Sequence, residues 1–131
     1  MEVERNMEQR TDSCVRRAVE LLAIDSPSGY TRQAAEHVMG AYEAMGLHPE
    51  MTRKGGVMVC LNPEAPAEDG LLLEAHLDTL GAMVSEISGS GRLHLTSLGG
   101  MQPNNGEAEN VRIVTRSGKI YTGTVQLKNA S

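Results

Sequence analysis

One short segment divides this sequence into two parts of different character. It runs from Leu71 to Gly81 and consists mainly of apolar residues around a His-x-Asp motif, His76-Leu77-Asp78. Before this segment, helical and extended patterns alternate, whereas the residues after it follow a β pattern alone. The division predicts an α/β region followed by an all-β region, with the His-x-Asp motif at the transition between them.

Two amphipathic helices are predicted before the segment. The first covers residues 7–24, and its apolar side chains recur at helical spacing, so we expect them to pack into a core. This stripe consists of Val15, Ala18, Val19 and Leu22. The sequence Asp25–Gly29 then ends the helix, because proline cannot continue it. The second helix covers residues 31–45, with Thr31 as its N-cap and Gly46 as the residue that terminates it.

Short extended segments fill the rest of the chain. Residues 47–61 predict a hairpin that turns at Gly55-Gly56. Leu71-Leu72-Leu73 predicts a strand covered on both faces, as in an α/β sheet. After residue 81, strands separated by glycine-containing turns are predicted over residues 82–87, 92–96, 111–115 and 120–127. Such a series of short strands is typical of a small barrel or sandwich.

The side chains available for a core are unusual. The sequence contains no Phe or Trp, three Tyr and eight Met, so aliphatic side chains and methionine must supply most of the core volume. Methionine fills gaps but specifies packing weakly. We therefore expect low stability in isolation, or a partner surface that completes the fold. Cys14 and Cys60 lack metal-ligand spacing and are expected to be buried thiols.

Charge and hydropathy exclude several classes of function. The 12 Lys and Arg residues face 17 Asp and Glu residues, which gives a net charge of −5 without a basic stripe. Because so few aromatic side chains are available for base stacking, we expect no nucleic-acid partner. No apolar run approaches the roughly 18 residues of a membrane span, and the charged N-terminus has no apolar leader behind it. We expect a cytoplasmic protein with no membrane partner.

His76 and Asp78 are the residues best suited to chemistry. Alternate residues of a strand point to the same face, and the end of a strand in an α/β sheet is where such folds place their ligands. A neutral imidazole binds zinc and related divalent metals, and a neighbouring carboxylate can fix the tautomer of its ring. Spacing alone leaves open a histidine hydrogen-bonded to an aspartate without any metal. Glu74 shares the same face, either as a third polar group of the site or as a solvated strand carboxylate.

The order and spacing of several motifs resemble metallopeptidase family 42, whose members are dinuclear-metal aminopeptidases that assemble into tetrahedral cages. These motifs follow one another along nearly the whole chain: Ser26-Pro27-Ser28-Gly29, the glycine-turn hairpin, Leu71–Asp78, Leu80-Gly81-Ala82-Met83-Val84 and Leu98-Gly99-Gly100. The stretch Leu98–Asn110 and the ending Gly123–Ser131 look like one branch of the family. The chain is thus similar to the N-terminal portion of a family 42 peptidase.

The resemblance implies a fold and a role for each matched residue. Residues 1–81 would be the N-terminal part of an α/β (phosphorylase/hydrolase-like) metallopeptidase domain. Residues 82–131 would be the first half of an inserted small β-barrel domain that makes dimer contacts. His76 would bind one of two divalent metal ions, zinc or cobalt, and Asp78 would be the catalytic aspartate that orients that site. Thr79-Leu80 departs from the family pattern, which usually carries a glutamate soon after the aspartate.

The same resemblance implies that the site is incomplete in these 131 residues. A catalytic zinc site needs about three protein ligands, and the family's other ligands and its general base lie downstream of the matched region. We expect the complete enzyme to be a homo-oligomer, built through the β insert, that hydrolyses N-terminal residues from peptides with a water activated by two metals. This chain alone is expected to be inactive and to bind no metal stably.

Two alternatives to this reading stay open. The first is a related metallopeptidase of the same clan with a different specificity. The second is a stand-alone, non-enzymatic assembly or binding protein derived from the fold.

Overall fold

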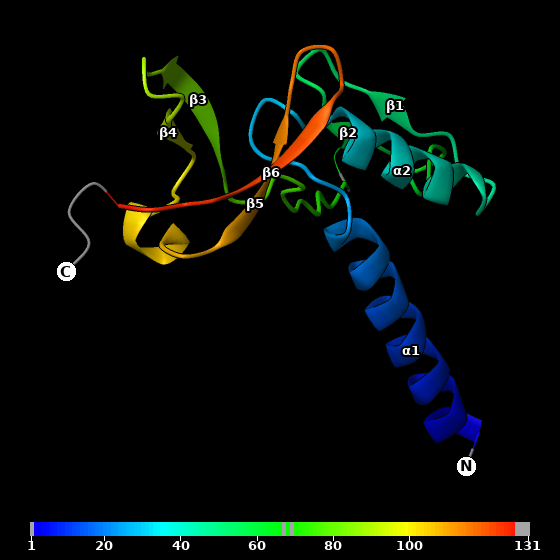
Figure 1. Ribbon diagram of the computed structural model, residues 1–131. Coiled ribbons are helices and arrows are strands. Elements are labelled where there is room, and N and C mark those ends of the chain that lie inside the picture. Colours follow the sequence, from blue (N-terminus) through cyan, green and yellow to red (C-terminus); the bar gives the residue numbers. More distant parts are fainter. Residues whose placement is uncertain (1, 67, 69, 128–131) are drawn as a thin grey trace. The chain divides into compact units, whose positions relative to one another are not determined.

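The structure, a computed structural model, describes residues 2–66, 68 and 70–127, with residues 2–5 described by their backbone (Figure 1). It combines two helices with small antiparallel sheets. The elements are α1 (Glu2–Leu22), α2 (Arg32–Glu43), β1 (Glu50–Met51), β2 (Val57–Met58), β3 (Gly81–Ile87), β4 (Leu93–Leu98), a 3-10 helix (Pro103–Gly106), β5 (Asn110–Val114) and β6 (Ile120–Thr124). The chain divides into two compact units, the first ending at Thr79 and the second beginning at Leu80. The assignment of residues 1–81 to a catalytic domain and of residues 82–131 to a dimerisation insert stays a prediction.

Both predicted helices are confirmed, although α1 begins earlier than predicted and both end earlier. Thr31 occupies the N-cap position of α2, but its side chain makes no capping hydrogen bond. Gly46 has the predicted left-handed conformation, with a φ of 78°. The Leu47 N–H donates to the Tyr42 carbonyl at 3.1 Å, and the Gly46 N–H donates to the Glu43 carbonyl at 2.9 Å. These two bonds form a Schellman motif, which ends α2 by pairing two of its last carbonyl groups.

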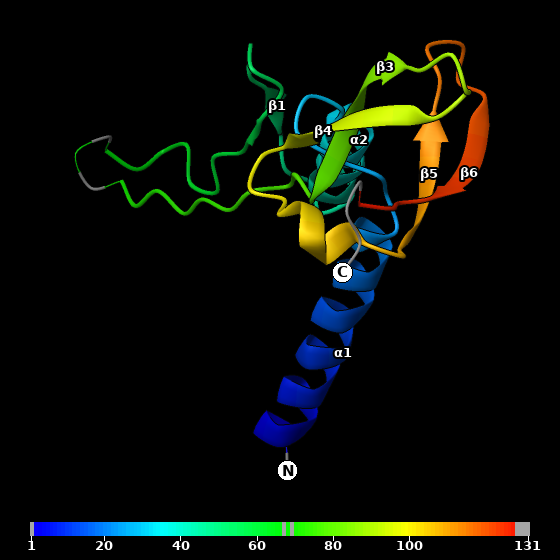
Figure 2. The ribbon, with the colours of Figure 1, turned by 60° about the vertical axis from the view of Figure 1, so that its left-hand side comes forward.

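The prediction that the apolar stripe of α1 packs into a core is wrong. Val15, Val19 and Leu22 are each more than half exposed, whereas Ala34 and Ala35 of α2 are fully buried. The C-terminal end of α1 lies beside α2, and its N-terminal turns extend beyond α2 in both views (Figures 1 and 2). The periodic apolar pattern therefore predicts an amphipathic helix correctly here. Its apolar face is buried only where another element packs against it.

The three hairpins use the same five-residue turn. β1 pairs with β2, β3 with β4 and β5 with β6, all antiparallel, and the turns are Thr52–Gly56, Ser88–Arg92 and Thr115–Lys119. In each turn the hydroxyl of the first residue accepts a hydrogen bond from the N–H of the fifth, at 3.0, 3.1 and 3.0 Å. The fourth residue is a glycine with a φ of 81°, a conformation that costs other L residues energy. The predicted glycine turns are thereby confirmed.

Among the described residues after residue 80, the strands form two separate hairpins, and their assignment to the first half of a small barrel stays a prediction. β3 and β4 make one two-stranded sheet, and β5 and β6 make another. A barrel needs a sheet that closes on itself, and a pair of separate hairpins leaves the strand edges open. The 3-10 helix Pro103–Gly106 also interrupts a region in which only strands and loops were predicted.

The prediction of a buried strand at Leu71-Leu72-Leu73 is wrong. These leucines are 85%, 79% and 80% exposed, and the chain from residue 71 to residue 78 is coil between β2 and β3 (Figure 2). Among the described residues, parallel pairing is confined to an isolated bridge between Pro27 and Thr79. The described residues therefore contain no sheet in which Leu71-Leu72-Leu73 is a strand covered on both faces. An apolar triplet becomes a strand when neighbouring strands and helices bury it, and these leucines are left exposed instead.

Two further expectations concern the surface of the chain. Cys14 and Cys60 are free and exposed, so the expectation of buried thiols is wrong. Cys14 lies on α1, whose apolar stripe is exposed, and Cys60 lies in the coil that follows β2. In the part of the chain that the structure describes, no helix is long and apolar enough to cross a membrane.

Candidate functional site

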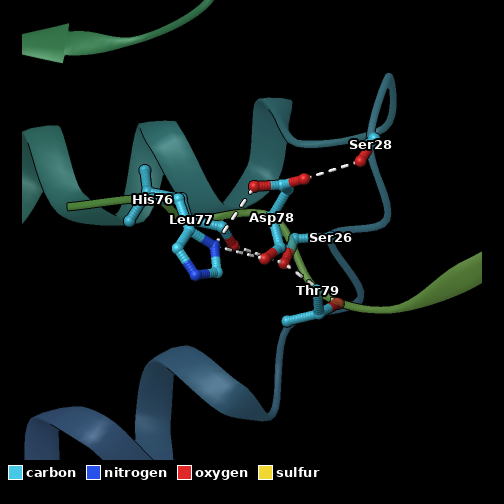
Figure 3. A network of polar contacts seen from close by, with 6 residues as sticks. All are labelled: Ser26, Ser28, His76, Leu77, Asp78 and Thr79. Carbon is cyan, nitrogen blue, oxygen red and sulfur yellow. Dashed lines mark hydrogen bonds and ion pairs between the residues drawn. The ribbon is translucent and has the colours of Figure 1, made fainter. Parts of the chain in front are cut away.

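Two segments that are about 50 residues apart in the sequence meet at the candidate site (Figure 3). The Thr79 N–H donates to the Ser26 carbonyl at 2.9 Å, next to the bridge between Pro27 and Thr79. The Ser26 hydroxyl donates to the Leu77 carbonyl at 2.9 Å and lies 3.5 Å from the Thr79 hydroxyl. Ser26 is 1% exposed. These hydrogen bonds are therefore sheltered from water, and they hold the two backbones against each other.

A tight turn presents Ser28 to the second segment. The Tyr30 N–H donates to the Pro27 carbonyl at 2.7 Å, and Gly29 has a φ of 87°. A left-handed glycine at the third position is the pattern of a type II turn. The sequence Pro-Ser-Gly-Tyr thus sets a local shape in which Ser28 is the second residue of the turn and its hydroxyl points toward Asp78 (Figure 3).

Asp78 is held by this turn. The Ser28 hydroxyl donates to Oδ2 of Asp78 at 2.6 Å. This hydrogen bond to the charged carboxylate lowers the pKa of Asp78 below its ordinary value of 3.8, and the positive charge that His76 can carry contributes less. Partial burial of the carboxyl acts in the opposite direction and is outweighed. Asp78 is therefore a carboxylate at neutral pH.

His76 meets Asp78 through one edge of its ring. Nδ1 lies 2.9 Å from the backbone carbonyl oxygen of Asp78 and 3.2 Å from its Oδ1 atom. Because both oxygens are acceptors, they favour the tautomer with the proton on Nδ1, which leaves the lone pair of the neutral ring on Nε2. The His76 side chain is 86% exposed. A histidine whose Nδ1–H is bound to a carbonyl or carboxylate is the form that binds metals through Nε2.

Comparison with known proteins gives this chain a family. A family model described as M42 glutamyl aminopeptidase matches residues 55–130, which are more than half of the chain and include His76 and Asp78. The chain belongs to the M42 glutamyl aminopeptidase family. The family predicted from the sequence motifs is thereby confirmed.

Two curated relatives show how much of an M42 protein is present. The putative aminopeptidase YhfE of Bacillus subtilis (strain 168) is 38% identical over 112 residues, which cover 86% of this chain and 32% of the relative. The glutamyl aminopeptidase of Lactococcus lactis subsp. cremoris (strain MG1363) is 27% identical over 106 residues, which cover 79% of this chain and 30% of the relative. This M42 chain therefore spans about a third of the length of these curated relatives.

The two predicted site residues of the M42 chain lie together, but in coil instead of a strand. Their roles as metal ligand and catalytic aspartate stay predictions. Among the residues that the structure describes, no group of three or more His, Cys, Asp or Glu side chains could hold a metal ion, so Glu74 does not complete a ligand set. Residues 128–131, at the end of the motif Gly123–Ser131, lie outside the described residues.

Ser26 and Ser28 are the contributors to the site that sequence reasoning missed. The sequence motif Ser26–Gly29 predicts the end of a helix and resembles a family motif, but it indicates no role for either hydroxyl. The residues that bind Asp78 and Leu77 could not be found from periodicity, because the contacts join positions about 50 residues apart. The available signal is the type II turn pattern, which predicts a tight turn with Ser28 at its second position.

Acid is expected to weaken the hydrogen bond between Ser28 and Asp78. The folded-state pKa of Asp78 is lowered, so its contribution to stability is fully present above the unfolded value of 3.8 and disappears as the pH falls through the lower folded value. An NMR titration of the Asp78 carboxyl carbon measures this pKa. Asp78→Asn keeps an acceptor for Ser28 but cannot ionise, so it should lack this acid-dependent loss. A carboxyl that titrates at or above 3.8 would contradict the expectation.

Proposed function

We propose that this chain supplies the N-terminal part of a metal-dependent aminopeptidase site, with His76 as a metal ligand and Asp78 as the residue that orients it. The single observation that carries the proposal is the pairing of His76 Nδ1 with the two Asp78 oxygens at 2.9 and 3.2 Å. Membership of the M42 family and the names of the two relatives, a putative aminopeptidase and a glutamyl aminopeptidase, support the reaction class. The substrate would be a peptide with a free N-terminus.

The residues present fit one ligand position of a divalent metal site. Nε2 of His76 is the nitrogen left with a lone pair, and imidazole suits zinc and cobalt. Asp78 has one oxygen bound to Ser28 and the other beside His76, which is the geometry of a carboxylate that orients a ligand. A catalytic zinc site needs about three protein ligands. The remaining ligands must therefore come from outside the described residues, and this chain by itself should not hold a metal stably.

The roles of the two side chains follow from their contacts. Asp78 keeps the proton of His76 on Nδ1, and His76 presents Nε2 in a fixed direction. Divalent ions, when bound, would polarise the scissile carbonyl and lower the pKa of the attacking water. Asp78 is itself engaged by Ser28 and His76 and has a lowered pKa, so it is a poor general base. The proton acceptor would be supplied by the part of an M42 protein that this chain does not span.

The second compact unit, which begins at Leu80, is proposed to mediate assembly of the complete, cytoplasmic enzyme. β3 exposes Met83 and Ile87, and β6 exposes Ile120 and Tyr121. Exposed apolar side chains on two-stranded sheets with open edges favour association with further strands. These surfaces support a homo-oligomer formed through residues 82–131.

Metal binding at His76 provides the direct test. Cobalt(II), which broadens NMR signals near it, should affect the ring of His76 before the rings of His37, His48 and His94. The expected affinity advantage is about tenfold, the lower end of what an orienting carboxylate contributes to a histidine ligand. Both exposed cysteines are changed to serine for this measurement, because thiolates bind the same metals.

The matched controls are two histidine-to-alanine substitutions. His76→Ala should remove the first and strongest broadening, whereas His94→Ala should leave it unchanged. Equal broadening of all four histidine rings in the parent chain would reject His76 as a ligand.

A further inference from the structure

One carboxylate connects the Ser26–Gly29 turn to the histidine ring. The Ser28 hydroxyl lies 2.6 Å from Oδ2 of Asp78, and Oδ1 of the same carboxylate lies 3.2 Å from Nδ1 of His76 (Figure 3). The two oxygens of a carboxylate are rigidly related to each other. A hydrogen bond that fixes Oδ2 therefore also fixes the direction in which Oδ1 faces the imidazole.

The tautomer of His76 depends on what faces Nδ1. A free neutral imidazole side chain in water favours the proton on Nε2, which would put that proton where a metal has to bind. Two oxygen acceptors at 2.9 and 3.2 Å from Nδ1 reverse the preference, because each one accepts from a proton at Nδ1 and repels a lone pair there. The first acceptor is a backbone carbonyl of fixed position, whereas the second belongs to a side chain that must be held in place.

We propose that Ser28 is a positioning residue for His76: its hydrogen bond to Asp78 orients the carboxylate and thereby keeps the imidazole in the tautomer with a bare Nε2. The significance of this tautomer for metal binding rests on the proposed function, but the positioning itself does not. Asp78 needs such a restraint because its side chain is 42% exposed and otherwise free to rotate toward water.

Because Ser26 holds the backbone of the second segment, the role of Ser28 can be tested without breaking the contact between the two segments. The backbone at Leu77 and Thr79 is held by the hydroxyl and the carbonyl of Ser26, at 2.9 Å in each case. Loss of the Ser28 hydroxyl leaves these bonds in place. The carboxylate should then become mobile while its backbone, and the carbonyl that faces Nδ1, stay where they are. Part of the tautomer preference should therefore persist without Ser28.

The test is the tautomer of His76 in the full chain, read from the nitrogen NMR shifts of its ring. The measurement is made above the pH at which the nitrogen shifts of the ring stop changing, so that only the neutral ring is read. In the parent chain His76 should carry its proton on Nδ1. In Ser28→Ala the ratio of the Nδ1–H to the Nε2–H form should fall about fivefold, the effect expected from one hydrogen bond. Ser28→Thr, which restores a hydroxyl, should restore the ratio.

Hydrogen exchange of the Thr79 amide reports whether the loop around Asp78 still lies against Ser26 in each variant, because this N–H is bound to the Ser26 carbonyl. If Ser28→Ala loses this protection, Ser28→Cys replaces it, since a thiol fills the same space and donates more weakly. A smaller fall in the ratio is then expected.

An unchanged tautomer ratio in a variant with an intact loop overturns the proposal. A parent His76 that is protonated on Nε2 also overturns it. If the tautomer responds to Ser28 as expected but cobalt does not contact His76, the proposed function fails and the positioning role of Ser28 stands.

Discussion

This 131-residue chain, supplied with zinc or cobalt, is expected to release no p-nitroaniline from aminoacyl-p-nitroanilides above the rate of the metal-containing buffer. Peptidase catalysis needs several metal ligands and a base to take a proton from water. The described residues place one histidine and one already engaged aspartate at the site. The expected deficit relative to a complete enzyme is about a million-fold or more, because enzymatic acceleration begins at about that size.

A graft of this chain into a relative shows whether its half of the site is competent. The chain replaces the matched 32% of the Bacillus subtilis relative, which then supplies the rest of an M42 protein. If the unmodified relative turns over the substrate, the graft should do so too, and His76→Ala in the graft should lower kcat/KM by at least about 100-fold. His94→Ala in the graft is the matched control and should change it little.

Turnover by the isolated chain would contradict its predicted inactivity. The decisive form of that result is activity that a chelator removes, that metal restores and that His76→Ala abolishes. Such activity would mean that the chain assembles a complete site, for example from several copies.

Ser26→Ala is expected to destabilise the first unit by about 1–3 kcal/mol, the cost of leaving a sheltered polar group without its partner. Ser26 is 1% exposed, and its hydroxyl is bound to the Leu77 carbonyl. Urea unfolding followed by far-ultraviolet circular dichroism measures the free energy of unfolding. Hydrogen exchange of the Thr79 amide measures the local effect, and its protection should fall in this variant.

Ser28→Ala is the matched control. It also removes one hydroxyl oxygen, two residues further along the chain, and the Ser28 side chain is less buried than that of Ser26. Its effect on the free energy of unfolding should be smaller, because water can replace the lost donor at the 42% exposed Asp78 side chain. Equal effects of the two substitutions, with Thr79 protection unchanged in both, would show that Ser26 does not hold the two segments together.

The elements that the sequence predicts well are those decided by neighbouring residues. Helical periodicity and Gly46 were sufficient to predict that α2 forms and how it ends. Glycine at the fourth position of each hairpin turn was sufficient for the three reversals of the chain. In each case the signal is a local conformational preference, such as a left-handed φ that glycine adopts without steric cost.

The predictions that failed required a distant surface. Leu71-Leu72-Leu73 carries a pattern typical of a buried strand, yet these side chains are exposed. The apolar stripe of α1 was predicted to be buried for the same reason and is also exposed. An apolar pattern indicates which side chains of a segment can be buried. Whether they are buried depends on the other elements that pack against the segment. The relatives, about three times as long as this chain, contain further residues that could provide such surfaces.

The sequence by itself determined the family, the two helices, the three glycine turns and the pairing of His76 with Asp78, because each rests on a motif or on residues that are close in the chain. Only the tertiary structure decided how that pair is held. Ser26 and Ser28 reach Leu77 and Asp78 from about 50 residues away, and no local pattern encodes such a contact. The contact forms because the two backbones lie side by side there, so that the two serine hydroxyls can donate to the Leu77 carbonyl and the Asp78 carboxylate.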